Sequence, residues 1–195
     1  MAFQVVAICT MLVFYGCYFG KMINQKIKGI QTDQIGKGKQ GIVKMIEMTM
    51  KIATVAVPII ELISIWLNTS CLPIWARYIG MLIAFIGDFI FICSVITMSD
   101  SWRAGVSKTD KTELITKGIY QISRNPAFLG FDLVYIGILI MFFNWGLFIL
   151  SGFAALMFHL QIVYVEEKFL TVTFGEDYLD YKRGVNRYFG RNKDK

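Results

Sequence analysis

Two polar segments in the C-terminal half of this 195-residue chain carry most of the side chains that could do chemistry. Residues 112–130 read TELITKGIYQISRNPAFLG, and the second segment begins at Glu166 and Glu167 and runs to residue 181. Together they supply aromatic rings, an arginine, an amide and paired carboxylates, groups that can bind a small molecule carrying both charges. Gly118 and Gly130 permit close backbone approach, and Pro126 biases its neighbour away from helix, so the first segment can wrap such a molecule.

Apolar stretches must position these segments, because 55% of the residues are apolar and 17% are charged. A membrane-spanning helix needs about 20 apolar residues, and windows of that size indicate five spans. They lie at about 2–20, 52–67, 74–98, 127–143 and 147–165. We therefore predict an all-α integral membrane protein in one domain, with three N-terminal helices in residues 1–99 and the catalytic and cofactor-binding region in residues 100–195.

The distribution of lysine and arginine predicts the orientation of these spans. Cytoplasmic loops retain basic residues, and nineteen of the 20 lie in residues 21–51, 100–126 and 166–195, leaving only Arg77 for the other side. The N-terminus is thus predicted outside and the C-terminus in the cytoplasm. The net charge of +6 follows from topology and predicts contact with membrane lipids rather than nucleic acid, because no basic stripe with interleaved aromatics is present.

The cysteine and histidine content argues against a metal centre. Four scattered cysteines and the single histidine, His159, do not have the spacing of a zinc site, which needs three or four protein ligands. We predict no metal and no disulfide framework, and the sequence defines no oligomeric state.

Two ordered motifs resemble a known enzyme family. The run GIYQISRNPAFLG resembles the G-x-Y-x-x-x-R-H-P-x-Y-x-G signature of the isoprenylcysteine carboxyl methyltransferases and their phospholipid methyltransferase relatives. The later EEKFLTVTFGEDYLDY is similar to their E-E-x-x-L and F-G-x-x-Y-x-x-Y tail. The resemblance covers about residues 102–181, and the first three spans match only in being hydrophobic.

This resemblance implies methyl transfer from S-adenosylmethionine, bound on the cytosolic side, to a lipophilic acceptor that enters from the bilayer. The leading acceptor is the carboxylate of a prenylated cysteine. The implied catalytic residues are Arg124, Asn125 and Glu167. The implied cofactor-binding residues are Thr112, Glu113, Leu114, Ile115, Gly118, Tyr120, Asn125, Pro126, Ala127, Phe128, Glu166 and Glu167.

Three positions depart from the family pattern. Asn125 replaces a histidine, Phe128 a tyrosine, and Thr112 a histidine of the eukaryotic enzymes. Asparagine still donates and accepts hydrogen bonds, so these changes bear on the acceptor more than on the cofactor. A carboxylate acceptor is already ionised, so its attack on a sulfonium methyl needs alignment and desolvation rather than a general base.

Two residues are candidates for acceptor binding. His159 lies seven residues before Glu166 and thus on nearly the same face of a regular helix, where it either lines the acceptor pocket or bonds a neighbouring helix. Asp132, six residues past Pro126, either faces the bundle interior in a structural role or lies near the site. Glu61 and Asp88 are expected to face the bundle interior in structural roles.

Three rival functions remain open from the sequence. A lipid amine or hydroxyl could be the acceptor, in which case a base would be needed. A sterol-reductase-like enzyme would bind NADPH, but the paired glutamates would repel its 2′-phosphate. A non-catalytic membrane protein is the third.

Overall fold

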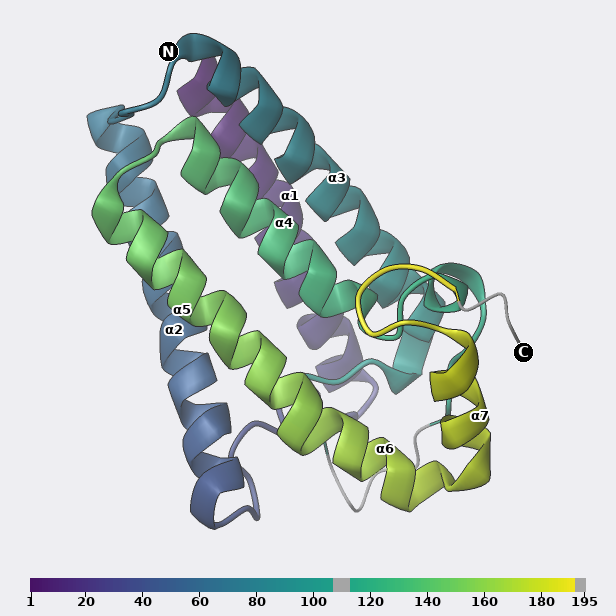
Figure 1. Cartoon of the computed structure of the whole chain (residues 1–195). Helices are drawn as coiled ribbons and strands as arrows, with labels where there is room; N and C mark the ends of the chain where they lie inside the picture. Colours follow the sequence, from purple (N-terminus) through teal and green to yellow (C-terminus); the bar gives the residue numbers. More distant parts are fainter. Residues whose placement is uncertain (107–112, 192–195) are drawn as a thin grey trace.

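The computed structural model describes residues 1–106 and 113–191, and its long elements are helices that run side by side in a bundle (Figure 1). The helices of the bundle are α1 (Ala2–Ile27), α2 (Gly41–Leu67), α3 (Ile74–Met98), α4 (Pro126–Met141) and α5 (Trp145–Gln161). In the described chain, four helices are long and apolar enough to cross a membrane, namely α1, α2, α3 and the continuous stretch Trp145–Phe174. The chain is an integral membrane protein, as predicted.

Helix α4 is the fifth and shortest member of the bundle. Its 16 residues span about 24 Å at 1.5 Å per residue, less than the roughly 30 Å of a bilayer core. Val134, Ile138 and Met141 are fully buried, so neighbouring helices rather than lipid cover much of its surface. The prediction of about five spans is therefore consistent with the structure.

Two of the predicted boundaries were wrong. Helix α2 begins at Gly41 and not near Ile52, and α1 continues past Gly20 to Ile27. Both extensions are amphipathic turns at the polar end of the bundle, where one side packs inward and the other carries lysines. A hydropathy window misses such turns because it averages both sides.

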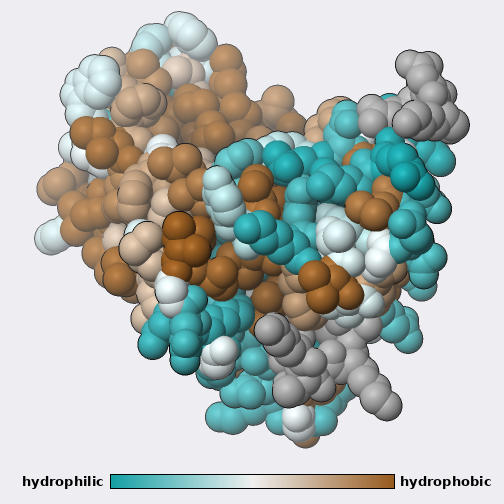
Figure 2. Space-filling model, turned by 60° about the horizontal axis from the view of Figure 1, so that its bottom comes forward, coloured by the Kyte–Doolittle hydropathy of each residue, from teal (hydrophilic) through white to brown (hydrophobic). Residues whose placement is uncertain are grey.

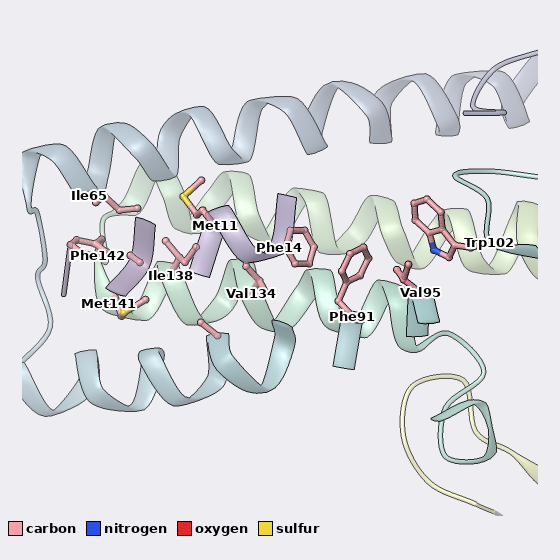
Figure 3. Packing of buried hydrophobic residues seen from close by; sticks show 12 residues of the cluster. Met11, Phe14, Ile65, Phe91, Val95, Trp102, Val134, Ile138, Met141 and Phe142 are labelled. Atoms are coloured by element: carbon pink, nitrogen blue, oxygen red, sulfur yellow. The ribbon is translucent and has the colours of Figure 1, made fainter. Parts of the chain in front are cut away.

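Close contact between α3 and α4 depends on glycine. A Cβ atom on Gly137 would lie 2.5 Å from the amide nitrogen of Ala84, and one on Gly80 would lie 2.5 Å from the carbonyl oxygen of Gly137. Gly80, Ala84 and Gly87 form a stripe of small residues along α3. Such stripes let helix backbones approach closely in membranes, where packing and not the hydrophobic effect drives association. Figure 3 shows the apolar core beside this contact, where Phe14 of α1 faces Phe91 of α3 at a centroid distance of 4.4 Å.

A short turn fixes the antiparallel register of α2 and α5. Asn144 caps α5 by accepting the amide of Leu147 (2.9 Å) and donates to the hydroxyl of Ser64 on α2 (2.9 Å). Glu47 is as many residues from Ser64 on α2 as Gln161 is from Asn144 on α5. The two residues therefore lie at the same level, near the opposite end of the bundle. The turn between α4 and α5 is short, as the three residues between the predicted fourth and fifth spans imply.

The polar end of the bundle is closed by the loop after α1 and by the C-terminal tail. Residues Thr32 and Gln34 pair with the main chain of Ala104, and the buried Gln25 donates to the carbonyl of Trp102 (2.9 Å). After α5 the chain continues through a π-helical turn, η3 (Ile162–Glu166), into α6 (Glu167–Phe174) and α7 (Glu176–Gly184). Figure 2 shows hydrophilic residues gathered at this end, while hydrophobic residues cover the flanks.

Candidate functional site

The first predicted segment lies directly against the C-terminal tail. The amide of Arg124 donates to the carbonyl of Asn186 (3.1 Å), and the side chain of Asn125 donates to the carbonyl of Arg187 (3.1 Å). Asn125 is also the residue that precedes α4, where Pro126 occupies the first helical position. Two segments more than 60 residues apart are thereby held together at the start of α4.

Tyr120 anchors the same segment to α3. Its buried hydroxyl lies 2.8 Å from that of Ser94, and its carbonyl accepts the hydroxyl of Tyr181 (2.6 Å). Burial raises the pKa of both tyrosines, so both hydroxyls stay protonated at neutral pH. Gly118 adopts a positive φ of +59°, and a side chain there would press on Thr97. The hydroxyl of Tyr120 is thus engaged with the protein itself, and its predicted cofactor role stays a prediction.

Glu167 is the centre of a buried charge network. Its carboxylate accepts two hydrogen bonds from Arg187 (2.7 and 3.2 Å) and one from Lys182 (3.1 Å), and lies 3.2 Å from Arg124. Arg124 in turn donates to the hydroxyl of Tyr178 (3.0 Å). The side chains of Glu167 and Arg124 are only 7% and 6% exposed, so each needs the other's charge. The hydrogen bond to Glu167 raises the pKa of Arg187.

The neighbouring Glu166 faces a different set of partners. Gln161 donates to Glu166 (3.1 Å) and to Glu47 of α2 (3.4 Å), so one amide bridges two carboxylates. Glu47 is fully buried and also accepts the amide of Gly36 (2.5 Å) and the ammonium group of Lys39. We call these four side chains, Lys39, Glu47, Gln161 and Glu166, the amide-bridged cluster.

A π-helical turn ends at Glu166 and sets the directions in which the two adjacent glutamates point. A π turn has i→i+5 hydrogen bonds, and such turns occur often at functional sites. The amide of Glu167 donates to the carbonyl of Ile162, which is this spacing of five residues. Adjacent side chains on a helix point about 100° apart. Here Glu166 lies toward α2 and Glu167 toward the tail. Because the π turn changes the angle between residues on either side of it, His159 and Glu166 do not share the helix face that a spacing of seven residues gives in a regular α-helix.

The amide-bridged cluster has unused hydrogen-bond acceptor capacity that suits a cation. Within the described residues it holds two carboxylates and one ammonium group, and the buried side-chain oxygen of Gln161 has no hydrogen-bond partner. A buried acceptor without a partner costs about 1–3 kcal/mol. These oxygen acceptors therefore fit an additional positively charged or N–H donating group, such as the amino group of S-adenosylmethionine.

An apolar cavity of about 260 Å³ lies beside this cluster, between α1, α2, α4 and α5. Residues from each helix line it, including Tyr15, Phe19, Met50, Val55, Phe128 and Phe158. Phe19 of α1 is 53% exposed and Val55 of α2 is 58% exposed, so the cavity opens on the helical flank between these two helices. Lys51, paired with Asp33 (2.7 Å), and Arg103 lie on its polar side.

The cavity and the amide-bridged cluster are adjacent along two helices. Met50 lies three residues after Glu47 on α2, and Phe158 lies three residues before Gln161 on α5, so each pair shares a helix face. Because α2 and α5 are antiparallel, both steps lead toward the polar end. The site thus combines an apolar cavity with the carboxylates of Glu47 and Glu166 about one helical turn away.

The structure distributes the other predicted cofactor residues widely. Ala127 and Phe128 line the cavity, and Pro126 is buried at the start of α4. Leu114 and Ile115 are half-buried and Glu113 is exposed. Thr112 lies outside the described residues. The structure thus brings the start of α4 to the cavity but leaves Glu113 in solvent.

The two predicted acceptor residues do not line this cavity. His159 pairs with the hydroxyl of Tyr188 (2.7 Å), and the two rings stack at 6.0 Å. This corresponds to the alternative in which His159 bonds a neighbouring segment. Asp132 is largely enclosed, and one of its oxygens has no partner among the described residues. The cavity opens between α1 and α2, and residues of α4 and α5 line its inner side.

Sequence reasoning missed Glu47, Gln161 and Arg187. Glu47 stands among lysines in a segment interpreted as a loop, and Arg187 was counted only as a topogenic charge. A signal for Glu47 exists: apolar residues at 43, 46, 50 and 53 continue the helical period of α2 and place Glu47 on the buried side.

Comparison with known proteins agrees with the motifs. The profile of the family described as phospholipid methyltransferase matches residues 75–177. The chain is also similar to curated proteins named protein-S-isoprenylcysteine O-methyltransferase.

Three such relatives illustrate the extent of the similarity. The Xenopus laevis protein is 28% identical over 113 residues, which cover 57% of this chain and 39% of the relative. Form A from Arabidopsis thaliana is 26% identical over 113 residues, 57% of each chain. The Dictyostelium discoideum protein is 27% identical over 135 residues, 65% of this chain and 56% of the relative. The matched part is therefore between about two fifths and three fifths of these relatives.

Proposed function

This chain belongs to the phospholipid methyltransferase family, and we propose that it transfers a methyl group from S-adenosylmethionine to a lipophilic acceptor within the membrane. One observation carries this proposal: an apolar cavity open to the bilayer flank lies about one helical turn from the buried carboxylate of Glu47 and the half-buried one of Glu166 at the polar end. A lipophilic acceptor needs the apolar cavity, and a cationic, water-soluble methyl donor needs the carboxylates beside it.

The amide-bridged cluster is the proposed site for the amino group of the donor. Glu166 and Glu47 offer carboxylate oxygens and Gln161 offers its unpartnered carbonyl. Glu47 and Gln161 are fully buried and Glu166 is half-buried, and charge-assisted hydrogen bonds are strong in such a setting. When bound, the donor supplies an electrophilic methyl group on sulfur. Glu167, which is already paired with three cations, would organise the start of α4 and the tail rather than contact the donor.

Arg124 and Asn125 are proposed to orient the acceptor's polar group. The buried Nε of Arg124 has no partner among the described residues, so one donor of its guanidinium is available. A guanidinium fits a carboxylate, which supports a carboxylate acceptor. The apolar walls from Phe128 and Phe158 exclude water, which leaves such a nucleophile less solvated and more reactive.

The acceptor is proposed to enter sideways between α1 and α2. Moving a fifteen-carbon prenyl chain through water would cost on the order of 10 kcal/mol at about 0.8 kcal/mol per CH₂ group. An opening between Phe19 and Val55 avoids this cost, since both side chains are exposed on the flank. The names of the relatives make a prenylated cysteine the leading acceptor.

The experiment is methyl transfer by the full chain in nanodiscs with radiolabelled S-adenosylmethionine. We expect label in N-acetyl-S-farnesylcysteine that is released by mild base, as a methyl ester is. Base-stable label in phosphatidylethanolamine instead would make a lipid amine the acceptor. Calorimetric binding of NADPH, with no binding of S-adenosylhomocysteine, would overturn the proposal in favour of a reductase.

A further inference from the structure

Three buried polar side chains lie beyond the inner end of the apolar cavity, and a fourth, half-buried one lines the cavity itself. On α2, Glu61 follows the cavity residue Thr54 by seven positions, which is two helical turns on the same face. Tyr135 stands in the same relation to Phe128 on α4.

Helix α5 repeats this arrangement. Ser151 precedes the cavity residue Phe158 by seven positions. Three helices thus each place one polar residue two turns further into the bundle than a residue of the cavity wall.

The fourth residue, Tyr15 of α1, connects this group to the cavity. Tyr15 lines the cavity, and its hydroxyl lies 3.4 Å from that of Tyr135. Val57 packs in one buried cluster with Tyr135 and Ala154, and Glu61 lies one helical turn beyond Val57 on the same face of α2. We call Tyr15, Glu61, Tyr135 and Ser151 the inner polar cluster.

The inner polar cluster has bonding capacity that the protein does not use. Glu61 is 0% exposed, yet neither of its carboxylate oxygens has a hydrogen-bond partner among the described residues. The hydroxyl of Ser151, 4% exposed, is also unpartnered there. An unpaired carboxyl group inside a membrane bundle is expensive, and such residues are functional candidates for that reason.

We propose that the inner polar cluster binds an oxygen-bearing group, a hydroxyl or a carbonyl, at the inner end of the lipid held in the cavity. A hydroxyl can donate to Glu61 and accept from a tyrosine, which satisfies both sides in one contact. This inference rests on the proposed use of the cavity for the acceptor. It adds that the preferred acceptor is polar at both ends, with an apolar chain between.

The test compares two probes that differ only at the inner end. One is N-acetyl-S-farnesylcysteine and the other carries a hydroxyl on the terminal isoprene unit. Trp102 lines the cavity and reports binding through its fluorescence when the lipid-exposed Trp66, Trp75 and Trp145 are replaced by Phe. We expect this otherwise complete chain to bind the hydroxylated probe at least tenfold more tightly.

Variants of the cluster should remove this preference. In Glu61→Leu and Tyr15→Phe we expect the ratio of the two dissociation constants to fall below threefold. Asp88→Asn is the matched control, because Asp88 is also a buried carboxyl group with an unpartnered oxygen but lies on α3, a helix that contributes no residue to the cavity wall. In Asp88→Asn the ratio of the two dissociation constants should equal that of the parental protein. If Glu61→Leu does not fold, Tyr15→Phe, which keeps the ring, decides alone.

Equal affinity for the two probes, or tighter binding of the unmodified one, would overturn the inference. So would a ratio that survives both cluster variants. Binding with the expected preference but no methyl transfer to either probe would instead refute the proposed function and leave the inner polar cluster as a ligand site.

Discussion

Arg187 holds Glu167 by two parallel hydrogen bonds, from Nε to Oε1 at 2.7 Å and from the terminal nitrogen to Oε2 at 3.2 Å. This bidentate pair joins the segment after α7 to the first residue of α6. With Arg124 on the opposite side, the carboxylate links three segments that are distant in sequence. The consequence is a structural role for Glu167 that can be separated from donor binding.

We predict that Glu167→Gln destabilises the protein by about 3–5 kcal/mol, because it leaves the buried guanidinium of Arg124 without its counter-charge. Unfolding in mixed micelles measures this. Lys182→Ala is the control: its ammonium group contacts the same carboxylate but is 41% exposed, so its loss should cost at most about 1 kcal/mol. Equal effects of the two variants would contradict the buried network.

We predict that Glu166→Gln and Glu47→Gln each weaken S-adenosylhomocysteine binding by about 1.5–3 kcal/mol, the range for a hydrogen bond to a charged group. This corresponds to a roughly 10- to 150-fold rise in Kd. Calorimetry measures it, with the exposed Glu176→Gln as the control. Unchanged affinity in the Glu47 and Glu166 double variant would remove the amide-bridged cluster from the donor site.

We predict that Val55→Trp raises the KM for a farnesylated acceptor by at least fivefold, because the larger ring blocks the opening between α1 and α2. The Kd for S-adenosylhomocysteine should change less than twofold. Ile52→Trp is the matched control, since Ile52 is 67% exposed on the same helix and does not line the cavity. A rise in KM for His159→Trp alone, with the KM of Val55→Trp unchanged, would place the entrance of the acceptor beside α5 instead.

We predict that Gly137→Ala costs more than 3 kcal/mol of stability, above the usual 1–3 kcal/mol for overpacking, because the new methyl group meets backbone atoms of α3. Gly152→Ala serves as the comparison, since nothing lies within 4 Å of a methyl group there. It should stabilise α5 by up to about 1 kcal/mol through helix propensity. Thermal unfolding of both variants tests this, and equal melting temperatures would refute the close α3–α4 contact.

We predict that the turn between α2 and α3 lies outside the cell and the C-terminal tail inside, from the distribution of basic residues. The exposed native Cys71 should react with an impermeant maleimide added to intact cells. A single cysteine at Lys182, with the four native cysteines replaced, should react only after permeabilisation. The reverse pattern would invert the topology.

Several parts of the site could be predicted because they depend on local pattern. The start of α4 at Asn125 and Pro126 follows from the fixed φ of proline and its fit to the first helical position. The hairpin at Asn144 follows from a capping residue between two apolar runs. Such features need no knowledge of distant neighbours.

Other parts could not be predicted, because they depend on small angular shifts along a helix. The π turn at Ile162–Glu166 rotates everything that follows it, so His159 bonds Tyr188 while Glu166 meets Glu47. No local pattern in IVYVE distinguishes a π turn from an α turn.

The sequence by itself determined that the chain is a membrane bundle, where its polar segments begin and which family its motifs resemble, since hydropathy and proline and glycine chemistry act over a few residues. Only the tertiary structure decided which charges meet. Glu166 and Glu167 are neighbours in sequence, yet one pairs through Gln161 with α2 and the other with Arg124 and Arg187. Partner choice among buried charges depends on packing across helices, because at low dielectric a carboxylate is stable only where the whole fold supplies its donors.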